Sequence, residues 1–129
     1  MIELAFAAWV ACSEVRIVDG DTFWCDNEKI RVAGIDTPEP SKYGNAECLA
    51  EAILGDSATR FAKMMLSGGS VTIQRVGEDK YGRTLANVKS HGEDYAAYVL
   101  EGLVARPYEG AMVDWCGPIQ GDKSQPQDR

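Results

Sequence analysis

Apolar and polar residues follow one another in short alternating runs that predict β-strands. Residues 14–18 (EVRIV) and 22–25 (TFWC) are β-branched and aromatic runs on either side of the turn sequence DGD, which predicts a hairpin. Residues 30–35 (IRVAGI) predict a third strand. Residues 71–76 and 84–90 predict two more strands around a polar loop.

Two further segments have the spacing of amphipathic helices. Residues 46–66 repeat apolar side chains at helical intervals, Gly55 weakens or kinks this helix, and Gly68 follows its end. Residues 94–103 predict a second helix that ends near Gly102. The side chains expected to face the core are Ala50, Leu54, Ala58, Phe61 or Ala62, and Met65 of the first helix, with Tyr95, Tyr98 or Val99, and Leu103 of the second.

The order of these elements predicts the fold class. Three strands, a helix, two strands and a helix indicate an α+β, mainly β protein: a five-stranded antiparallel OB-fold barrel with two or three external helices. A chain of 129 residues, 45% of them apolar, suits one globular domain with one core. We place this domain at residues 14–118, after an N-terminal arm (1–13) and before a flexible C-terminal tail (119–129).

The N-terminal arm permits two interpretations. Its sequence MIELAFAAWVAC has the apolar, small-residue texture of the end of a secretory signal, although it lacks a basic segment and carries Glu3. A first strand or an ordered arm explains the same residues equally well. No apolar run in the sequence approaches the length needed to cross a bilayer, so we expect no membrane association.

Four cysteines bear on the compartment. Cys12, Cys25, Cys48 and Cys116 lack the spacing of a zinc site, and their even number is compatible with two disulfides. Disulfides predict a secreted or periplasmic protein, whereas reduced cysteines would fit the cytoplasm. Of the three possible pairings we favour Cys12 with Cys25, because these lie on the two arms of the first hairpin, which leaves Cys48 for Cys116.

The charge of the chain restricts how it could meet a polyanion. Its formal net charge is −7 and its pI is near 4.6, which argues against binding nucleic acid through a broad basic surface. A bound cation and a few arginines can still reverse the field locally. The tryptophans are expected to serve in packing more than in base stacking; they are Trp9, Trp24 and Trp115.

Acids and arginines gather at the ends of the predicted strands. Asp21 follows the first turn, Arg31 lies within the third strand, the segment DTPEP (36–40) follows that strand, and Arg83 ends the loop DKYGR. Carboxylates with a loop carbonyl suit hard cations such as Ca²⁺ or Mg²⁺, and arginine forks match phosphate oxygens. Singly, each feature has an ordinary explanation in turn formation or surface ion pairing. Together they indicate a site for phosphodiester chemistry.

Four segments occur in an order that resembles the staphylococcal nuclease (thermonuclease-like) family. These segments are VDGDT (18–22), RVAGIDTPE (31–39), DKYGRTLA (79–86) and EGLVARPY (101–108). The resemblance covers roughly residues 14–108, and the combination is far more specific than any one segment. It implies the OB barrel with external helices.

The resemblance also implies a site and an activity. It assigns Ca²⁺ binding to Asp21, Asp36 and the Thr37 carbonyl, catalysis to Arg31, Glu39 and Arg83, and substrate binding to Lys80, Tyr81 and Tyr108. The implied activity is calcium-dependent endonucleolytic hydrolysis of DNA and RNA that leaves 3′-phosphate ends, by a monomer that needs no protein partner. The alternative is a catalytically inactive OB-fold module that binds nucleic acid or protein.

Overall fold

The computed structural model describes residues 7–102 and 104–117, and its strands form one large sheet and one small one. The strands are Trp9–Ala11 (β1), Val15–Asp19 (β2), Thr22–Cys25 (β3), Glu28–Val32 (β4), Ile35–Asp36 (β5), Val71–Glu78 (β6), Thr84–Ser90 (β7), Glu93–Asp94 (β8) and Arg106–Pro107 (β9). The helices are Leu49–Leu66 (α1) and Tyr95–Glu101 (α2). The small sheet contains only β5 and β9.

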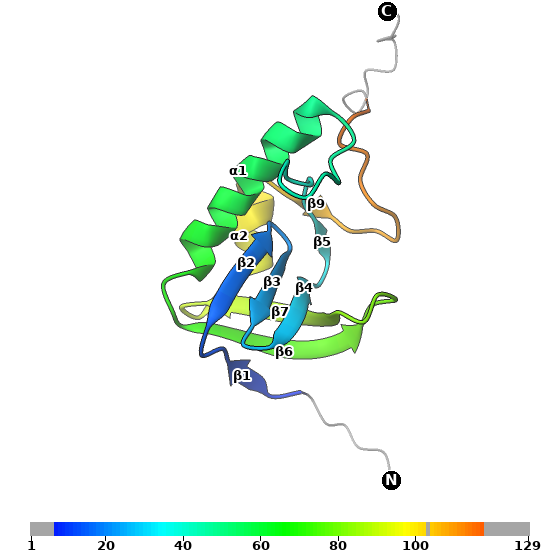
Figure 1. Ribbon diagram of the computed structural model, residues 1–129. Coiled ribbons are helices and arrows are strands. Elements are labelled where there is room, and N and C mark those ends of the chain that lie inside the picture. Colours follow the sequence, from blue (N-terminus) through cyan, green and yellow to red (C-terminus); the bar gives the residue numbers. More distant parts are fainter. Residues whose placement is uncertain (1–6, 103, 118–129) are drawn as a thin grey trace, which may run out of the picture.

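The large sheet has the strand order β1-β6-β7-β4-β3-β2 (Figure 1), and β8 pairs with β7. The two ends of this order, β1 and β2, are consecutive in the chain. The N–H of Cys12, which directly follows β1, donates to the carbonyl of Val71 at 2.9 Å. One bent N-terminal segment therefore pairs with β6 at its start and with β3 at its end, as in a partly open OB-like barrel. The predicted fold class is confirmed.

The predicted elements are found close to their expected bounds, with three differences. The barrel was expected to be antiparallel, but β4 and β7 pair in parallel. The strand expected over 30–35 is divided, because Gly34 adopts φ +85° and separates β4 from β5. The structure also contains β8 and β9, which are too short to give a periodic signal, and β1, which agrees with the first strand considered for the N-terminal arm.

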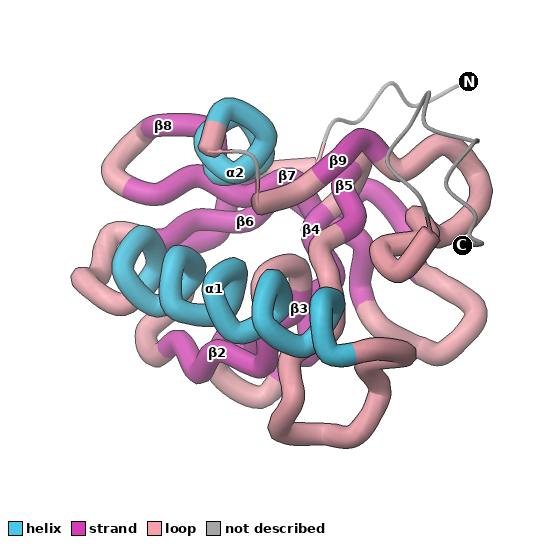
Figure 2. Tube along the Cα trace, turned by 90° about the horizontal axis from the view of Figure 1, so that it is seen from above, coloured by secondary structure: helices cyan, strands magenta, loops and turns pink. Residues whose placement is uncertain are grey.

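The core lies between the sheet and the two helices, which pack at different places on it (Figure 2). Alternation along the strands places Phe23, Ile30 and Ile73 inward, each at most 1% exposed. From α2, Tyr95 and Val99 are fully buried, whereas Leu103 lies outside the described residues. The hydroxyl of Tyr95 donates to the carbonyl of Gly20 at 2.7 Å, so the core also anchors the β2–β3 turn.

Helix α1 buries Ala58 and Ala62 as expected, but its first half buries a different side from the one expected. Leu54 is 44% exposed, and the buried positions are Glu51, Gly55, Ala58, Ala62 and Leu66. Two of these five positions are not apolar because the first half of the helix packs against the loop after β5. The inward positions there carry a carboxylate and a glycine, which apolar periodicity cannot detect.

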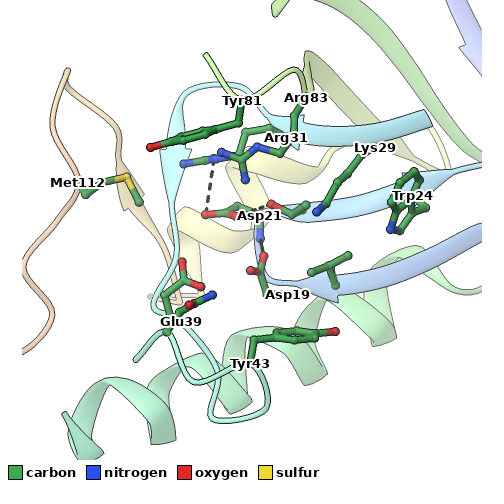
Figure 3. Close-up of a pocket in the computed structure, with 13 residues that line it drawn as sticks. Asp19, Asp21, Trp24, Lys29, Arg31, Glu39, Tyr43, Tyr81, Arg83 and Met112 are labelled. Carbon is green, nitrogen blue, oxygen red and sulfur yellow. Dashed lines mark hydrogen bonds and ion pairs between the residues drawn. The ribbon is translucent and has the colours of Figure 1, made fainter. Parts of the chain in front are cut away.

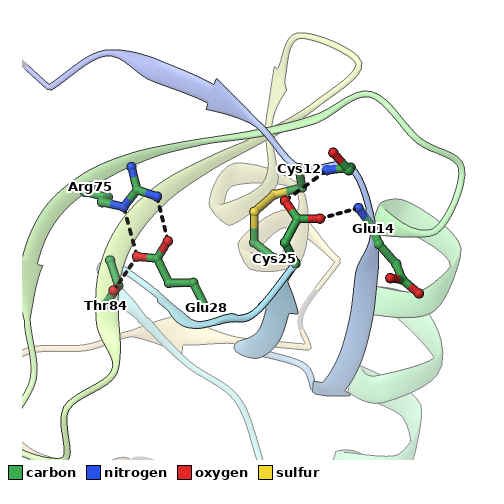
Figure 4. The surroundings of a disulfide bond; sticks show 8 residues. Cys12, Glu14, Cys25, Glu28, Arg75 and Thr84 are labelled. Atoms are coloured by element: carbon green, nitrogen blue, oxygen red, sulfur yellow. Dashed lines mark hydrogen bonds and ion pairs between the residues drawn. A yellow bond between two sulfur atoms is a disulfide. The ribbon is translucent and has the colours of Figure 1, made fainter.

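Two disulfides link distant parts of the chain, and they confirm the favoured pairing. Cys12 joins Cys25 with a Cα–Cα distance of 5.2 Å, so the end of β1 is tied to the end of β3 (Figure 4). Cys48 joins Cys116 at 6.0 Å, and Cys48 is also the N-cap of α1. The second disulfide therefore fastens the segment after β9 to the beginning of α1. Both are compatible with an oxidising compartment.

No helix among the described residues is long and apolar enough to cross a membrane. The predicted domain limits stay a prediction. Within the arm, residues 9–11 form β1, whereas residues 1–6 and the whole predicted tail lie outside the described residues.

Removing each disulfide should reduce stability by a different amount. The Cys12–Cys25 and Cys48–Cys116 bonds close sequence separations of 13 and 68 residues, and a longer closed loop removes more entropy from the unfolded chain. Replacing both cysteines of a pair with serine should lower the free energy of unfolding by about 3 kcal/mol for the short loop and about 4 kcal/mol for the long one. Urea unfolding of the two double variants measures this. Four free thiols in the denatured, unreduced wild type would refute both bonds.

Candidate active site

A cleft of about 800 Å³ opens beside the β2–β3 turn and the outer face of β3 and β4. Charged side chains line it from several elements: Asp19, Asp21, Lys29, Arg31, Glu39 and Arg83. Figure 3 shows the carboxylates of Asp19, Asp21 and Glu39 on one side, with the guanidinium groups of Arg31 and Arg83 above them. The cleft therefore has an acidic side and a basic side in a chain that is acidic overall.

Asp21 connects the β2–β3 turn to the loop that follows β5. Its Oδ1 accepts a hydrogen bond from Thr22 Oγ1 at 2.9 Å, and its Oδ2 accepts one from the N–H of Thr37 at 3.0 Å. Within the turn, the N–H of Asp21 donates to Asp19 Oδ1 at 3.0 Å. Asp21 is only 4% exposed, so these bonds replace its hydration and fix its orientation.

Asp36 is held in the small sheet, where it pairs with Arg106 of β9. Its Oδ2 accepts the N–H of Val113 at 2.8 Å, while its Oδ1 is buried without a hydrogen-bond partner. The hydroxyl of Thr37 is likewise buried and unpaired among the described residues. Asp36 and Thr37 line a smaller hollow of about 140 Å³ behind the main cleft, and Glu39 lines both.

Arg31 lies between the two aspartates and is 7% exposed. Its Nη1 donates to the carbonyl of Ile35 at 2.8 Å and to that of Val32 at 3.1 Å. The same Nη1 is 3.5 Å from Asp21 Oδ2, and Nη2 is 3.8 Å from Asp36 Oδ1. Two carbonyls and two carboxylates thus fix a permanently charged fork beside the cleft.

Arg83 is oriented by the loop that carries it. The carboxylate of Asp79 accepts the N–H groups of Tyr81 and Arg83, each at 2.9 Å, and also Arg83 Nε at 2.6 Å. One aspartate therefore shapes the turn after β6 and directs the guanidinium that follows it. The ion pair holds Nε, so the rest of the fork is presented to the cleft.

The three residues expected to bind substrate lie together next to the cleft. Lys80, Tyr81 and Tyr108 line an adjoining hollow of about 430 Å³ that shares Arg31 and Arg83 with the main cleft. Tyr81 is 72% exposed and Tyr108 is 42% exposed, so both rings are open to solvent. The structure thus gathers all nine predicted residues around one connected region.

Burial and neighbouring negative charges raise the pKa values of three carboxyl groups of the site. Burial, with a further contribution from Asp21, raises the pKa of Asp19 to about 8. Burial and the carboxylates of Asp21 and Glu51 raise the pKa of Glu39 to about 7. Burial also raises the pKa of Asp36 above its ordinary value, against the opposing hydrogen bond from Val113. Burial is the largest cause of all three shifts, and neighbouring carboxylates add to it.

The oxygen ligands of the site suit a hard cation that is bound by only a few side chains. Within residues 7–102 and 104–117, no group of three or more His, Cys, Asp or Glu side chains has an arrangement that could hold a metal ion. Any ion here would depend on fewer carboxylates, completed by carbonyl or water oxygens. Such an all-oxygen set suits Ca²⁺. The Oδ1 of Asp36, which is buried without a hydrogen bond and lies 3.8 Å from Arg31 Nη2, is an oxygen that such an ion could use.

Two residues of α1 that the sequence analysis did not assign position the loop of Glu39. Glu51 is 6% exposed; its Oε2 accepts the N–H of Glu39 at 2.9 Å and its Oε1 accepts that of Glu47 at 3.0 Å. A Cβ added to Gly55 would overlap the carbonyl oxygen of Glu39. Helical spacing places Glu51 and Gly55 on the same face as Ala58 and Ala62, and this was the available signal in the sequence. To use it, one would have had to place a charged residue on the inward side of the helix.

Comparison with known proteins gives two matches. The family described as "Staphylococcal nuclease homologue" matches residues 29–113. A thermonuclease of Staphylococcus intermedius is 38% identical over 79 residues, and the match covers 57% of this chain and 45% of that protein. The chain thus aligns with less than half the length of this relative. The family match includes Arg31, Glu39 and Arg83, whereas Asp21 precedes it.

The contact of Gly55 with the Glu39 loop can be tested by adding one methyl group. Gly55→Ala should lower the free energy of unfolding by about 1–3 kcal/mol, because the methyl group overlaps backbone atoms that cannot move independently. This is opposite to the effect of helix propensity, which favours alanine over glycine by about 1 kcal/mol. Chemical denaturation measures the change.

Gly68→Ala, just beyond the end of α1, is the control for adding a methyl group where it meets no backbone. A Cβ at Gly68 meets only His91 Cε1 at 3.7 Å, an ordinary contact, so stability should change by less than about 0.5 kcal/mol. Equal stability of the Gly55→Ala variant and the wild type would show that α1 and the Glu39 loop do not pack as described.

Proposed function

We propose that this chain, which belongs to the family of staphylococcal nuclease homologues, is a calcium-dependent endonuclease that hydrolyses phosphodiester bonds of DNA and RNA. One observation carries the proposal: two oriented arginines and the carboxylates of Asp21 and Glu39 line the same cleft. A module that only binds nucleic acid needs positive charge but not buried, mutually repelling carboxylates. By analogy with the family, the products carry 3′-phosphate ends.

Asp21, Asp36 and the Thr37 carbonyl would hold the calcium ion. Bound there, the ion would act as a Lewis acid toward a phosphoryl oxygen and would neutralise charge that develops at phosphorus. The two carboxylates are fixed before any ion binds, Asp21 by Thr22 and Thr37 and Asp36 by Val113. Pre-ordered ligands reduce the entropy lost on binding.

Glu39 would orient the attacking water and accept its proton. Its backbone is fixed by Glu51, and its loop by Pro38 and Pro40, so the side chain enters the cleft from a rigid support. Burial and neighbouring carboxylates raise the pKa of Glu39 to about 7. A carboxylate that enters the cleft from a rigid support is placed to act as a general base.

Arg31 and Arg83 would bind the phosphoryl group that is attacked. As the water adds, negative charge on the phosphoryl oxygens increases, and oriented guanidinium groups stabilise this charge without reorganising. Arg31 is anchored by Ile35 and Val32, and Arg83 by Asp79. Lys80, Tyr81 and Tyr108 would contact the nucleotide next to the reacting phosphate, in the adjoining hollow.

The disulfides support action in an oxidising compartment, as a secreted or periplasmic protein. The proposed partner is the nucleic-acid substrate alone. One chain supplies every residue assigned here, so we propose that the enzyme works as a monomer.

Calcium removal should abolish cleavage. Incubation of the purified protein with plasmid DNA or with RNA should give cleavage in calcium and none with excess chelator, and added calcium should restore it. The physical reason is that Arg31 and Arg83 without the ion cannot offset both the carboxylates and a polyanionic substrate. Analysis of product ends by phosphatase sensitivity tests for 3′-phosphate. Full activity in chelator would contradict the calcium assignment.

Three substitutions should separate the assigned roles. Arg83→Lys keeps the charge but loses the planar fork, so turnover should fall by about a hundredfold or more while substrate affinity changes much less. Glu39→Gln should reduce turnover and leave calcium affinity largely intact, and Asp36→Ala should lose both. Turnover measurements and calcium titration calorimetry on each variant provide the data.

Arg75→Lys is the matched control for Arg83→Lys. Arg75 pairs with Glu28 outside the cleft, so the same exchange there should leave turnover unchanged. The alternative function, an inactive module that binds nucleic acid or protein, predicts no turnover in the wild type. It also predicts affinity losses that depend only on the charge removed at Arg31 or Arg83.

A further inference from the structure

An aromatic ring and two cations continue the basic side of the cleft along the sheet. Strand register places Arg16 opposite Trp24, and Trp24 opposite Lys29, on three neighbouring strands. Side chains two positions apart share a face, so Trp24 and Lys29 lie on the same face as Thr22 and Arg31. The intervening residues Phe23 and Ile30 point into the core. We call Arg16, Trp24 and Lys29 the Trp24 strip.

The Trp24 strip lies at the surface and is not consumed by packing. Trp24 is only partly buried and is not among the residues of the core, contrary to the packing role expected from the sequence. The guanidinium carbon of Arg16 is 5.3 Å from the centre of its ring and the Nζ of Lys29 is 5.7 Å from it. Neither cation belongs to an ion pair among the described residues, although the chain has a net charge of −7.

The strip is continuous with the proposed active site. Trp24 and Lys29 line the same cleft of about 800 Å³ as Arg31 and Arg83. Figure 3 shows Lys29 between Arg31 and Trp24, on the side of the cleft away from Met112. Positions two residues apart on a strand are separated by roughly 7 Å, which is about the length of one extended nucleotide. A strand whose phosphate lies at Arg31 therefore reaches the strip with its next nucleotide.

We propose that the Trp24 strip is a binding subsite for a neighbouring nucleotide of a single-stranded nucleic acid. The indole would stack on the base, and Lys29 and Arg16 would neutralise the adjacent phosphate. Stacking on an aromatic ring requires an unstacked, unpaired base, so the subsite selects single strands and tolerates any sequence. This inference rests on the proposed function and adds to it a subsite, built from Arg16, Trp24 and Lys29, for the nucleotide next to the one at Arg31.

The test measures how affinity depends on probe length. Fluorescein-labelled oligothymidylates of two and twelve nucleotides would be bound to the full chain carrying Glu39→Gln, with calcium, and followed by fluorescence anisotropy. The longer probe should bind more tightly, and this gain should shrink on the order of tenfold when Trp24→Ala is added. Trp24→Phe keeps an aromatic ring and should retain most of the gain, which protects the test if the alanine variant folds poorly.

Salt dependence separates the roles of the ring and the cations. Lys29→Gln should reduce the slope of log affinity against log salt concentration by about 0.7 for the twelve-nucleotide probe, because one phosphate contact is lost. Trp24→Ala should weaken binding and leave that slope unchanged. The matched controls are Trp9→Ala and Lys89→Gln, since Lys89 lies 4.4 Å from the ring of Trp9 outside the cleft and forms the same kind of pair.

Equal losses from the Trp24 and Trp9 variants, or an unchanged gain with probe length in Trp24→Ala, would overturn the subsite. Turnover of the wild type is measured in parallel and judges the proposed function separately. If the wild type cleaves and Trp24→Ala has no effect on binding, the proposed nuclease function stands and the subsite is refuted. If binding depends on probe length and requires Trp24 but the wild type does not cleave, the subsite stands and the proposed nuclease function is refuted.

Discussion

The guanidinium of Arg31 is almost out of contact with water, and a buried charge is tolerated only where its partners compensate for the lost hydration. The compensating groups come from separate segments: the carbonyls of Val32 and Ile35, Asp21 in the β2–β3 turn, and Asp36 in β5. Their positions are therefore linked through one side chain. The site is organised around this charge. The short strand β5 supplies two of its partners, the carbonyl of Ile35 and the carboxylate of Asp36.

A second buried charge performs a similar role from the helix. The carboxylate of Glu51 accepts a hydrogen bond from the backbone N–H of Glu39, and the absence of a side chain at Gly55 allows the Glu39 loop to approach α1. The Cys48–Cys116 bond joins the start of this helix to the segment whose Val113 binds Asp36. Both carboxylates of the site that lie outside the hairpin are thus positioned by contacts with residues remote in sequence.

Local patterns explain what the sequence alone could predict. The hairpin, β7 and the position of α1 follow from periodicity and turn residues, and the acids and arginines meet because each lies at the end of such an element. The pairing of β5 with β9 and the inward direction of Glu51 depend on long-range contacts and left no periodic signal. Leu54 was misassigned for the same reason: the surface facing that turn of α1 is a backbone loop and not an apolar sheet.

The parallel pairing of β4 with β7 has a consequence for how the molecule is made. Arg31 and its neighbour across the sheet, Leu85, are far apart in the sequence, so this edge of β4 stays unpaired until most of the chain has been synthesised. Late contacts of this kind slow folding, and an open strand edge invites association with other chains. A ribosome-bound or truncated chain that ends before β7 would contain Asp21, Arg31 and Glu39 but would expose that edge. The strand pair that brings the two arginines together is therefore also the pair that can form only late in synthesis.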